Sequence, residues 1–207
     1  MAVSYPATMP TSGVTSVQWT NATSSLISRS PFSFQGQAQS YGGGIRYASI
    51  TVEDLNREQA QDWLGFLDSL NGTLGTFLFG DPMAATPQGS GGGGPTVSAV
   101  NGTTRDILTV STNLTTTTNG WLRRGDWIQL GQGLDARLYK VCNNVSINSS
   151  GQSNNINVWP KFRNIPTAGD AVTILNPKGL FRRTSGSYSY SQVACNYSLS
   201  FDCEEVI

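Results

Sequence analysis

Residues 56–82, NREQAQDWLGFLDSLNGTLGTFLFGDP, decide how the rest of this chain is organised. Apolar residues recur there at three- and four-residue spacing, which predicts a helix with one apolar face. These residues are Ala60, Trp63, Leu64, Leu67 and Leu70. A short apolar strand is predicted next, over residues 76–79, and Gly80-Asp81-Pro82 ends it. We expect the helix to lie on a sheet and to cover its apolar face.

Local signals mark both ends of this helix. Asn56 is the expected N-cap, and Gln59 stands three residues later, as a capping box requires. Leu55 is placed to pack on Ala60 as a hydrophobic staple. Asn71-Gly72 is expected to end the helix in a left-handed turn.

The composition favours strands and polar turns over further helices. Of the 207 residues, 38% are hydrophobic, only 13% are charged and 23 are glycine. The 13 basic and 13 acidic residues balance, which argues against a general electrostatic grip on nucleic acid or an anionic membrane. No apolar run approaches the roughly 20 residues of a membrane helix, and the first residues lack the pattern of a signal peptide.

Residue types that often carry catalysis are scarce. Histidine is absent, which removes Ser-His-Asp and Cys-His catalysis and the commonest zinc ligand. Cys142, Cys195 and Cys203 match no metal or redox spacing, so free thiols are expected, with a Cys195–Cys203 bridge as the alternative. Residues 89–94, GSGGGG, have a linker composition and lack the Gly-Lys-Ser/Thr of a phosphate loop.

The segment before the helix is expected to hold short strands. Residues 1–14 are expected to form a loose arm, because Pro and Gly interrupt them and nothing is periodic. Strands are expected over residues 14–19 and 25–28, around a polar turn, and over residues 45–52, which run into the helix.

Two features lie between these strands. Phe32 and Phe34 alternate with polar residues, as in a half-buried strand. The three glycines of residues 42–44 are expected to form a loop.

The glycine-rich segment is the best boundary in the chain. About six β-like runs follow it in about 85 residues, which suits a small closed barrel. They are residues 96–100, 107–111, 120–130, 137–145, 155–160 and 171–175. Two alternating strands in residues 181–207 then need partners from before residue 82. We therefore expect a discontinuous outer domain, residues 1–88 and 179–207, with a barrel of residues 89–178 inserted into it.

Four segments of the outer domain carry a specific pattern. They are Ser30-Pro31-Phe32-Ser33 with Gln35 and Gln37, the helix from Gln59 to Gly72, Gly75-Thr76-Phe77-Leu78-Phe79-Gly80-Asp81-Pro82, and Tyr197-x-Leu199-x-Phe201 before Glu204-Glu205. Together they resemble the distal tail proteins of long-tailed bacteriophages, which form the ring that joins the tail tube to the tail tip.

The resemblance implies a mainly β fold: a β-sandwich of tail-tube type with one packed helix, and an inserted barrel like the oligonucleotide/oligosaccharide-binding (OB) fold. It implies a structural virion protein of the phage tail tip, made in the host bacterial cytoplasm, with no enzymatic activity, no cofactor and no membrane insertion. The implied partners are itself, as a homohexamer, the tail tube protein, the tail-tip hub and tape-measure proteins, and side fibres. DNA would pass through the lumen as cargo.

Aromatic residues supply the candidate contacts. Trp63, Phe66, Phe77 and Phe79 are expected to pack between helix and sheet, and Phe66, at the edge of the helix stripe, is a candidate subunit-interface residue.

In the barrel, aromatic residues lie among basic ones. These are Trp121, Trp127, Tyr139 and Trp159. Alternation along strands favours barrel core; the alternative is a surface that binds a carbohydrate or a receptor through stacking and charge.

Acidic residues support a third, weaker hypothesis, a glycan hydrolase. Asp126 and Asp170 are candidate paired carboxylates, although the Gly-Asp turns that contain them already explain both. Asp202, Glu204 and Glu205 are expected to form a solvated acidic end rather than a cation site.

Overall fold

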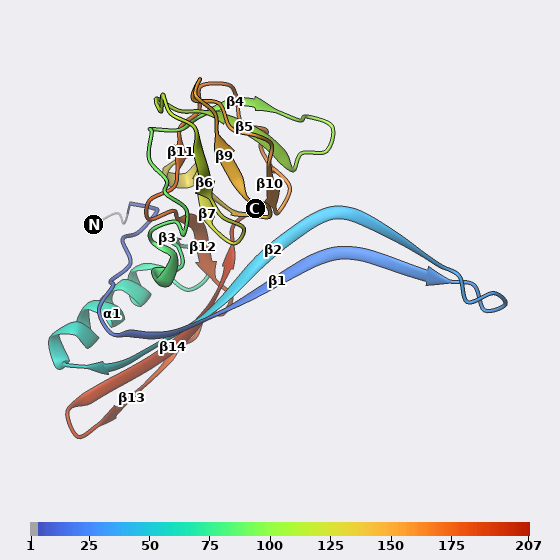
Figure 1. Ribbon diagram of the computed structural model, residues 1–207. Coiled ribbons are helices and arrows are strands. Elements are labelled where there is room, and N and C mark those ends of the chain that lie inside the picture. Colours follow the sequence, from blue (N-terminus) through green and yellow to red (C-terminus); the bar gives the residue numbers. More distant parts are fainter. Residues whose placement is uncertain (1–3) are drawn as a thin grey trace.

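A computed structural model describes residues 4–207 as a mainly β protein, with 48% strand and 9% helix. Its single α-helix within those residues is α1 (Arg57–Ser69), as the periodicity predicted. Figure 1 shows α1 against one sheet, a barrel-like unit above it, and a long hairpin that leaves the body. No helix of the described part is long and apolar enough to cross a membrane.

The first sheet gathers strands from both ends of the chain. Its strand order is β1-β2-β14-β12-β3, β13 pairs with β14, and every pairing is antiparallel. The strands are β1 (Val14–Arg29), β2 (Gly36–Leu55), β3 (Thr76–Phe79), β12 (Gly179–Arg183), β13 (Ser189–Val193) and β14 (Asn196–Glu205). A short 3-10 helix, η1 (Pro82–Ala84), follows β3.

The second sheet is nearly closed into a barrel, with six strands in the order β11-β7-β8-β10-β5-β4. Its strands are β4 (Thr96–Val100), β5 (Ile107–Ser111), β7 (Trp127–Leu130), β8 (Arg137–Val141), β10 (Ile156–Trp159) and β11 (Val172–Thr173). A separate pair, β6 (Thr118–Leu122) and β9 (Val145–Ile147), and the 3-10 helix η2 (Gly133–Asp135) complete the unit. An isolated bridge between Thr96 and Ala171 joins the two ends of the barrel sheet.

Each sheet encloses its own hydrophobic core. The first core packs α1 on its sheet and is drawn from residues 48–79 and 181–203. The second fills the barrel and is drawn from residues 97–174. Alternation produces this division, because along β14 the side chains of Leu199, Phe201 and Cys203 turn inward while their neighbours stay outside.

The ends of α1 confirm the predicted caps. The side chain of Asn56 accepts from the backbone N–H of Gln59 at 2.9 Å, and the Gln59 side chain accepts from the Asn56 N–H at 3.1 Å. Asn71 and Gly72 follow with φ of 49° and 73°, the left-handed turn expected after the helix.

The N-terminal segment is not a loose arm over its described part. The hydroxyl of Tyr5 donates to the carbonyl of Ser69, and Ala7 bridges to Phe77. The indole of Trp63 donates to the carbonyl of Ser12 at 2.8 Å. Residues 4–13 therefore form a strap along α1, whereas residues 1–3 of the predicted arm lie outside the described residues.

The polar turn predicted between residues 14–19 and 25–28 is wrong, whereas the strand predicted over residues 45–52 lies within β2. Residues 14–29 form one strand without a turn, and the glycines of residues 42–44 lie inside β2 rather than in a loop. Phe32 and Phe34 sit in the turn between the two strands and are exposed, not half-buried. A polar sequence of Ser, Thr and Gln forms this hairpin because pairing with the opposite strand satisfies its backbone groups.

All three cysteines are free, with Cys203 in the first core and Cys195 exposed beside the turn between β13 and β14. The bridge between Cys195 and Cys203 is not formed. Burial raises the pKa of the Cys203 thiol, so this group stays protonated and unreactive.

Replacing Asn56 by alanine removes the N-cap and the partner of Gln59. We expect Asn56→Ala to lower the free energy of unfolding by about 1 kcal/mol, measured by urea denaturation. Gln61→Ala, at an exposed helical site whose side chain makes no hydrogen bond within residues 4–207, is the control and should change stability by much less. Equal losses in the two variants would contradict a capping role for Asn56.

Candidate assembly interface

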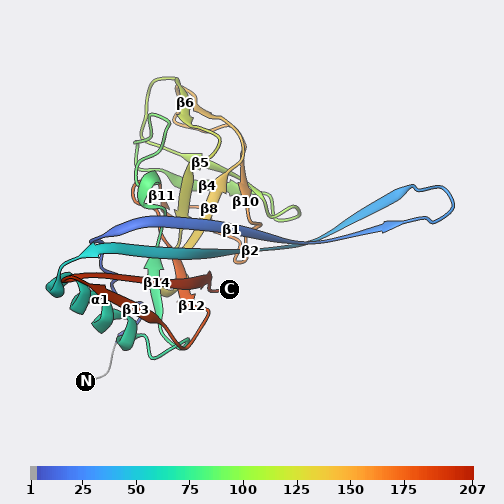
Figure 2. The same cartoon turned by 90° about the horizontal axis from the view of Figure 1, so that it is seen from below.

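The most unusual feature of the molecule is the end of the β1–β2 hairpin. Pairing of β14 with β2 stops at Glu204 opposite Tyr47, whereas β1 and β2 continue to pair with each other as far as Arg29 opposite Gly36. Figures 1 and 2 show this two-stranded ribbon projecting beyond both sheets. We call residues 22–44 the arm.

The arm lacks the features that normally stabilise a strand pair. Every residue from 21 to 43 is exposed except Ser30 and Gly42, which are half-buried. Arg29 is the only charged residue between 22 and 44. A two-stranded hairpin without a packed face is marginally stable in water, and its open edges invite another strand. The arm is therefore a candidate contact with another chain.

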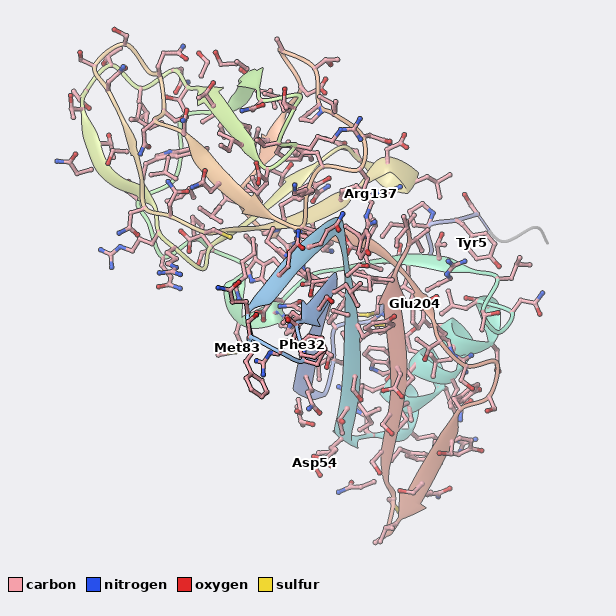
Figure 3. The ribbon with its side chains drawn as sticks, turned by 90° about the vertical axis from the view of Figure 1, so that its right-hand side faces the viewer. Tyr5, Phe32, Asp54, Met83, Arg137 and Glu204 are labelled. Atoms are coloured by element: carbon pink, nitrogen blue, oxygen red, sulfur yellow. The ribbon has the colours of Figure 1, made fainter. Side chains whose placement is uncertain are left out.

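The tip of the arm displays two aromatic rings. The Ser30 hydroxyl accepts from the backbone N–H groups of Phe32 and Ser33, both at 3.3 Å, and Phe34 N–H donates to the Ser30 carbonyl at 3.0 Å. Phe32 is 95% exposed and Phe34 81% exposed. Figure 3 labels Phe32 at the end of the arm that faces the viewer. This turn holds the rings away from the rest of the chain.

The base of the arm passes close to the barrel. Arg163 donates through Nη2 to the Gly44 carbonyl. A Cβ atom at Gly44 would lie 3.0 Å from Cβ of Pro160 and 3.1 Å from the ring of Trp159. A side chain at Gly44 would be tight against Pro160 and Trp159, so this close approach favours glycine at this one of the three positions expected to form a loop.

Next to this contact, a buried ion network joins the two cores. Arg46 of β2 is 0% exposed and lies between the rings of Trp127 and Trp159, at 4.8 Å from each centroid. Its guanidinium donates to the carbonyls of Leu138 and Trp159, both from the barrel. Glu205 of β14 lies 3.6 Å from it.

Burial is the largest cause of the pKa shifts of both Arg46 and Glu205. It lowers the pKa of the Arg46 guanidinium to about 10, although Glu205 opposes the shift. It also raises the pKa of the Glu205 carboxyl, against the pull of Arg46 and of Arg163, whose Nη2 lies 3.9 Å away. Each charge is costly to bury alone, and each offsets the cost of the other. Glu205 is 1% exposed, so its assignment to a solvated acidic end is wrong.

The four candidate aromatics of the first unit lie in its core. Trp63, Phe77 and Phe79 are at most 1% exposed, and Phe66 is 7% exposed. The ring of Phe66 meets Trp63 and Phe77 edge-on, with centroids 5.9 and 5.5 Å away. Packing accounts for all four, and a role of Phe66 at a subunit interface stays a prediction.

The barrel aromatics do not form a binding surface. Trp121, Trp127 and Tyr139 are 0%, 4% and 2% exposed, and the half-buried ring of Trp159 is occupied by Arg46. The core alternative is therefore correct for Trp121 and Tyr139, which lie in the barrel core, whereas Trp127 is buried outside that core, against Trp19 and Arg46. A sugar ring would find none of these three faces open for stacking.

The two candidate catalytic carboxylates hold turns together. Asp126 is 3% exposed and accepts from the backbone N–H groups of Gln88, Gly89 and Arg123. Asp170 accepts from the backbone and the hydroxyl of Thr167 at 2.8 and 2.9 Å. Asp126 also ties the linker, residues 89–94, to the barrel at its start. Turn chemistry thus explains both residues.

No protein-family model matches the chain, and a comparison with curated proteins finds no match.

Removing one partner of the buried ion network should lower the stability of the fold, because the other charge stays buried. We expect Arg46→Met to lower the free energy of unfolding by about 3 kcal/mol or more, because Glu205 then stays buried with a weaker partner. The double variant Arg46→Met/Glu205→Gln should recover part of this loss, which a double-mutant cycle in urea measures.

The half-buried surface pair Arg182–Glu204, with its atoms 3.1 Å apart, is the matched control. Arg182→Met should cost less than about 1 kcal/mol. A loss at Arg46 no larger than at Arg182 would show that the network does not join the two cores.

Proposed function

We propose that this chain is a structural ring component of a phage tail tip, of the distal-tail type, in which copies associate side by side around a lumen. The proposed finer fold is a tail-tube-type β-sandwich carrying an OB-like barrel. Six copies would join the tail tube to the tail-tip hub and tape-measure proteins, with side fibres as further partners. The resemblance of four segments supports this reading, and three structural observations add to it.

The arm is the observation that carries the proposal. Its residues 22–44 have exposed backbone edges and only one charge, Arg29. Such a ribbon loses conformational entropy on ordering without burying apolar surface of its own. A neighbouring chain that covers the arm supplies the missing burial, as in assemblies built by strand addition.

The edges of the first sheet give the second support. β1 forms one edge along its whole length, and β13, exposed at all five residues, forms another. Both edges present unpaired backbone groups, which normally invite strand pairing. Different edges on one subunit favour a head-to-tail contact, and such contacts close into rings.

The face of this sheet opposite α1 gives the third support. It is lined by polar side chains along β2 and β14, whereas the residues between them are buried under the helix. These polar residues are Ser49, Thr51, Glu53, Ser198, Ser200 and Asp202. A neutral-to-acidic surface gives DNA phosphates no electrostatic hold, which suits a lumen through which DNA passes as cargo.

Deleting the arm tests the proposal. Replacement of residues 24–43 by Asn-Gly leaves Thr23 and Gly44, which are paired in the hairpin, joined by a two-residue turn. We expect a folded protein with a melting temperature close to that of the full chain. Light scattering across a concentration series should show the full chain shifting toward about six copies and the deletion variant staying monomeric.

A milder variant separates the tip from the ribbon. Phe32→Ser/Phe34→Ser changes only exposed side chains, so it should leave stability unchanged and weaken association. Association that is identical in the full chain, the deletion variant and the serine variant would rule out the arm as the assembly element. A full chain that stays monomeric at all concentrations would count against self-assembly of the isolated protein.

A further inference from the structure

The exposed surface of α1 and the corner before it carry a concentrated negative charge. Five exposed acidic residues lie between positions 53 and 68, against one basic residue, Arg57. The acidic residues are Glu53, Asp54, Glu58, Asp62 and Asp68. Glu58 and Asp62 are four residues apart, so they lie on one face of α1. The whole chain has zero net charge, so this segment carries a local excess of negative charge.

Gly65 lies on the same helical face, and residues 4–207 give no reason for a glycine there. A Cβ atom at Gly65 would meet none of these described residues within 4 Å, and φ is not in the left-handed region. Glycine inside a helix is destabilising relative to alanine. Together with Asp62 and Phe66, Gly65 lines a groove of about 530 Å³ between α1 and the strap. A glycine with open space above it permits close approach of a second chain.

A second region carries the opposite charge. A cleft of about 490 Å³ lies between the base of the arm and the barrel, and three cations line it: Arg105, Lys161 and Arg163. Arg163 is 3.9 Å from Glu205, but neither Arg105 nor Lys161 takes part in an ion pair within residues 4–207. Among the described residues, no acidic side chain lines the cleft.

The loop that presents Arg105 is held in place. The side chain of Asn101 accepts from the backbone N–H groups of Thr103 and Thr104 at 3.0 and 3.2 Å. Phe162 N–H donates to the carbonyl of Arg105 at 2.6 Å, which links the two barrel loops that line the cleft. Because this backbone is already ordered, binding of an anion would cost little further conformational entropy.

The two charged regions lie on opposite sides of the molecule. Figures 1 and 2 both place α1 on the left of the body, and the arm together with the loop between β4 and β5 on the right. Complementary patches on opposite sides of one subunit produce a head-to-tail contact, which repeats from copy to copy and closes when the rotation permits.

We propose that the acidic face of α1, with Glu58, Asp62 and Gly65, docks against the cleft lined by Arg105 and Lys161 of a second copy of this chain. The inference rests on the proposed ring function and names the surfaces that meet. Gly65 lets the second chain approach the helix, and the charges select orientation and raise the association rate. The contact is weakened by salt because the groups lie at the surface.

Charge reversal on each side gives a direct test. Variant one is Arg105→Glu/Lys161→Glu, and variant two is Glu58→Lys/Asp62→Lys; all four residues are exposed. Each variant alone should be folded and should associate at least about tenfold more weakly than the wild type, because like charges then face each other. Arg123→Glu/Arg124→Glu, an exposed basic pair elsewhere in the barrel, is the matched control and should associate like the wild type.

Mixing the two variants tests the pairing itself. In an equimolar mixture, each reversed surface of one variant meets a complementary surface of the other, so association should return with the variants in one-to-one ratio. Light scattering gives the mass, and native mass spectrometry gives the ratio. A mixture that stays as weakly associated as its components would overturn the proposed contact.

Carbodiimide cross-linking of the wild type gives a second, independent readout. Lys161 should join to Glu58 or Asp62 of another copy, identified in mixtures of isotopically light and heavy protein. Association that is intact in both charge variants, with no such cross-link, would reject this contact while leaving the ring proposal standing. Wild-type protein that does not associate at any concentration would reject both together.

Discussion

The buried contact of Arg46 with Glu205 holds this molecule together at its centre. Arg46 belongs to β2 and Glu205 to β14, yet the guanidinium is enclosed by two tryptophans and two carbonyls of the barrel. Two charges removed from water are costly unless geometry and hydrogen bonds compensate. Separating the two cores would leave both charges without their barrel partners. The network therefore favours one specific position of the two cores relative to each other.

That position also decides where the arm points. Gly44 is two residues from Arg46, and the chain passes within contact distance of Trp159 and Pro160 before it enters solvent. A stacked cluster reinforces the junction, because Trp19 of β1 contacts Phe79 at 5.3 Å and Trp127 of the barrel at 5.6 Å. The junction therefore fixes the base of the arm, and the paired strands extend from it.

Features that could contact other chains are concentrated in separate parts of the surface. Large apolar side chains are exposed at the tip of the arm, the edges of the first sheet are open, and acidic and basic clusters face opposite ways. The interior, in contrast, is filled by aromatic and aliphatic side chains and leaves the barrel tryptophans largely inaccessible. These features suit a protein whose contacts are made by its periphery with other chains, rather than one that holds a small ligand inside.

Sequence reasoning succeeded where the signal is local. The caps of α1, its apolar face and the strands at 76–79, 96–100 and 107–111 follow from spacing and turn residues that a short window contains. It failed for the hairpin, because polar residues with no alternation carry no burial signal, and their pairing partner lies up to 38 residues away, as for Val14 and Val52.

The sequence by itself determined a mainly β chain with one capped helix and no histidine chemistry, because propensity, capping and composition are properties of neighbouring residues. Only the tertiary structure decided that Glu205 is buried against Arg46, that Gly44 passes close to Trp159, and that Asp126 accepts from the backbone of Gln88 and Gly89. Each of these depends on groups 37 to 159 positions apart, brought together by packing that no short segment encodes.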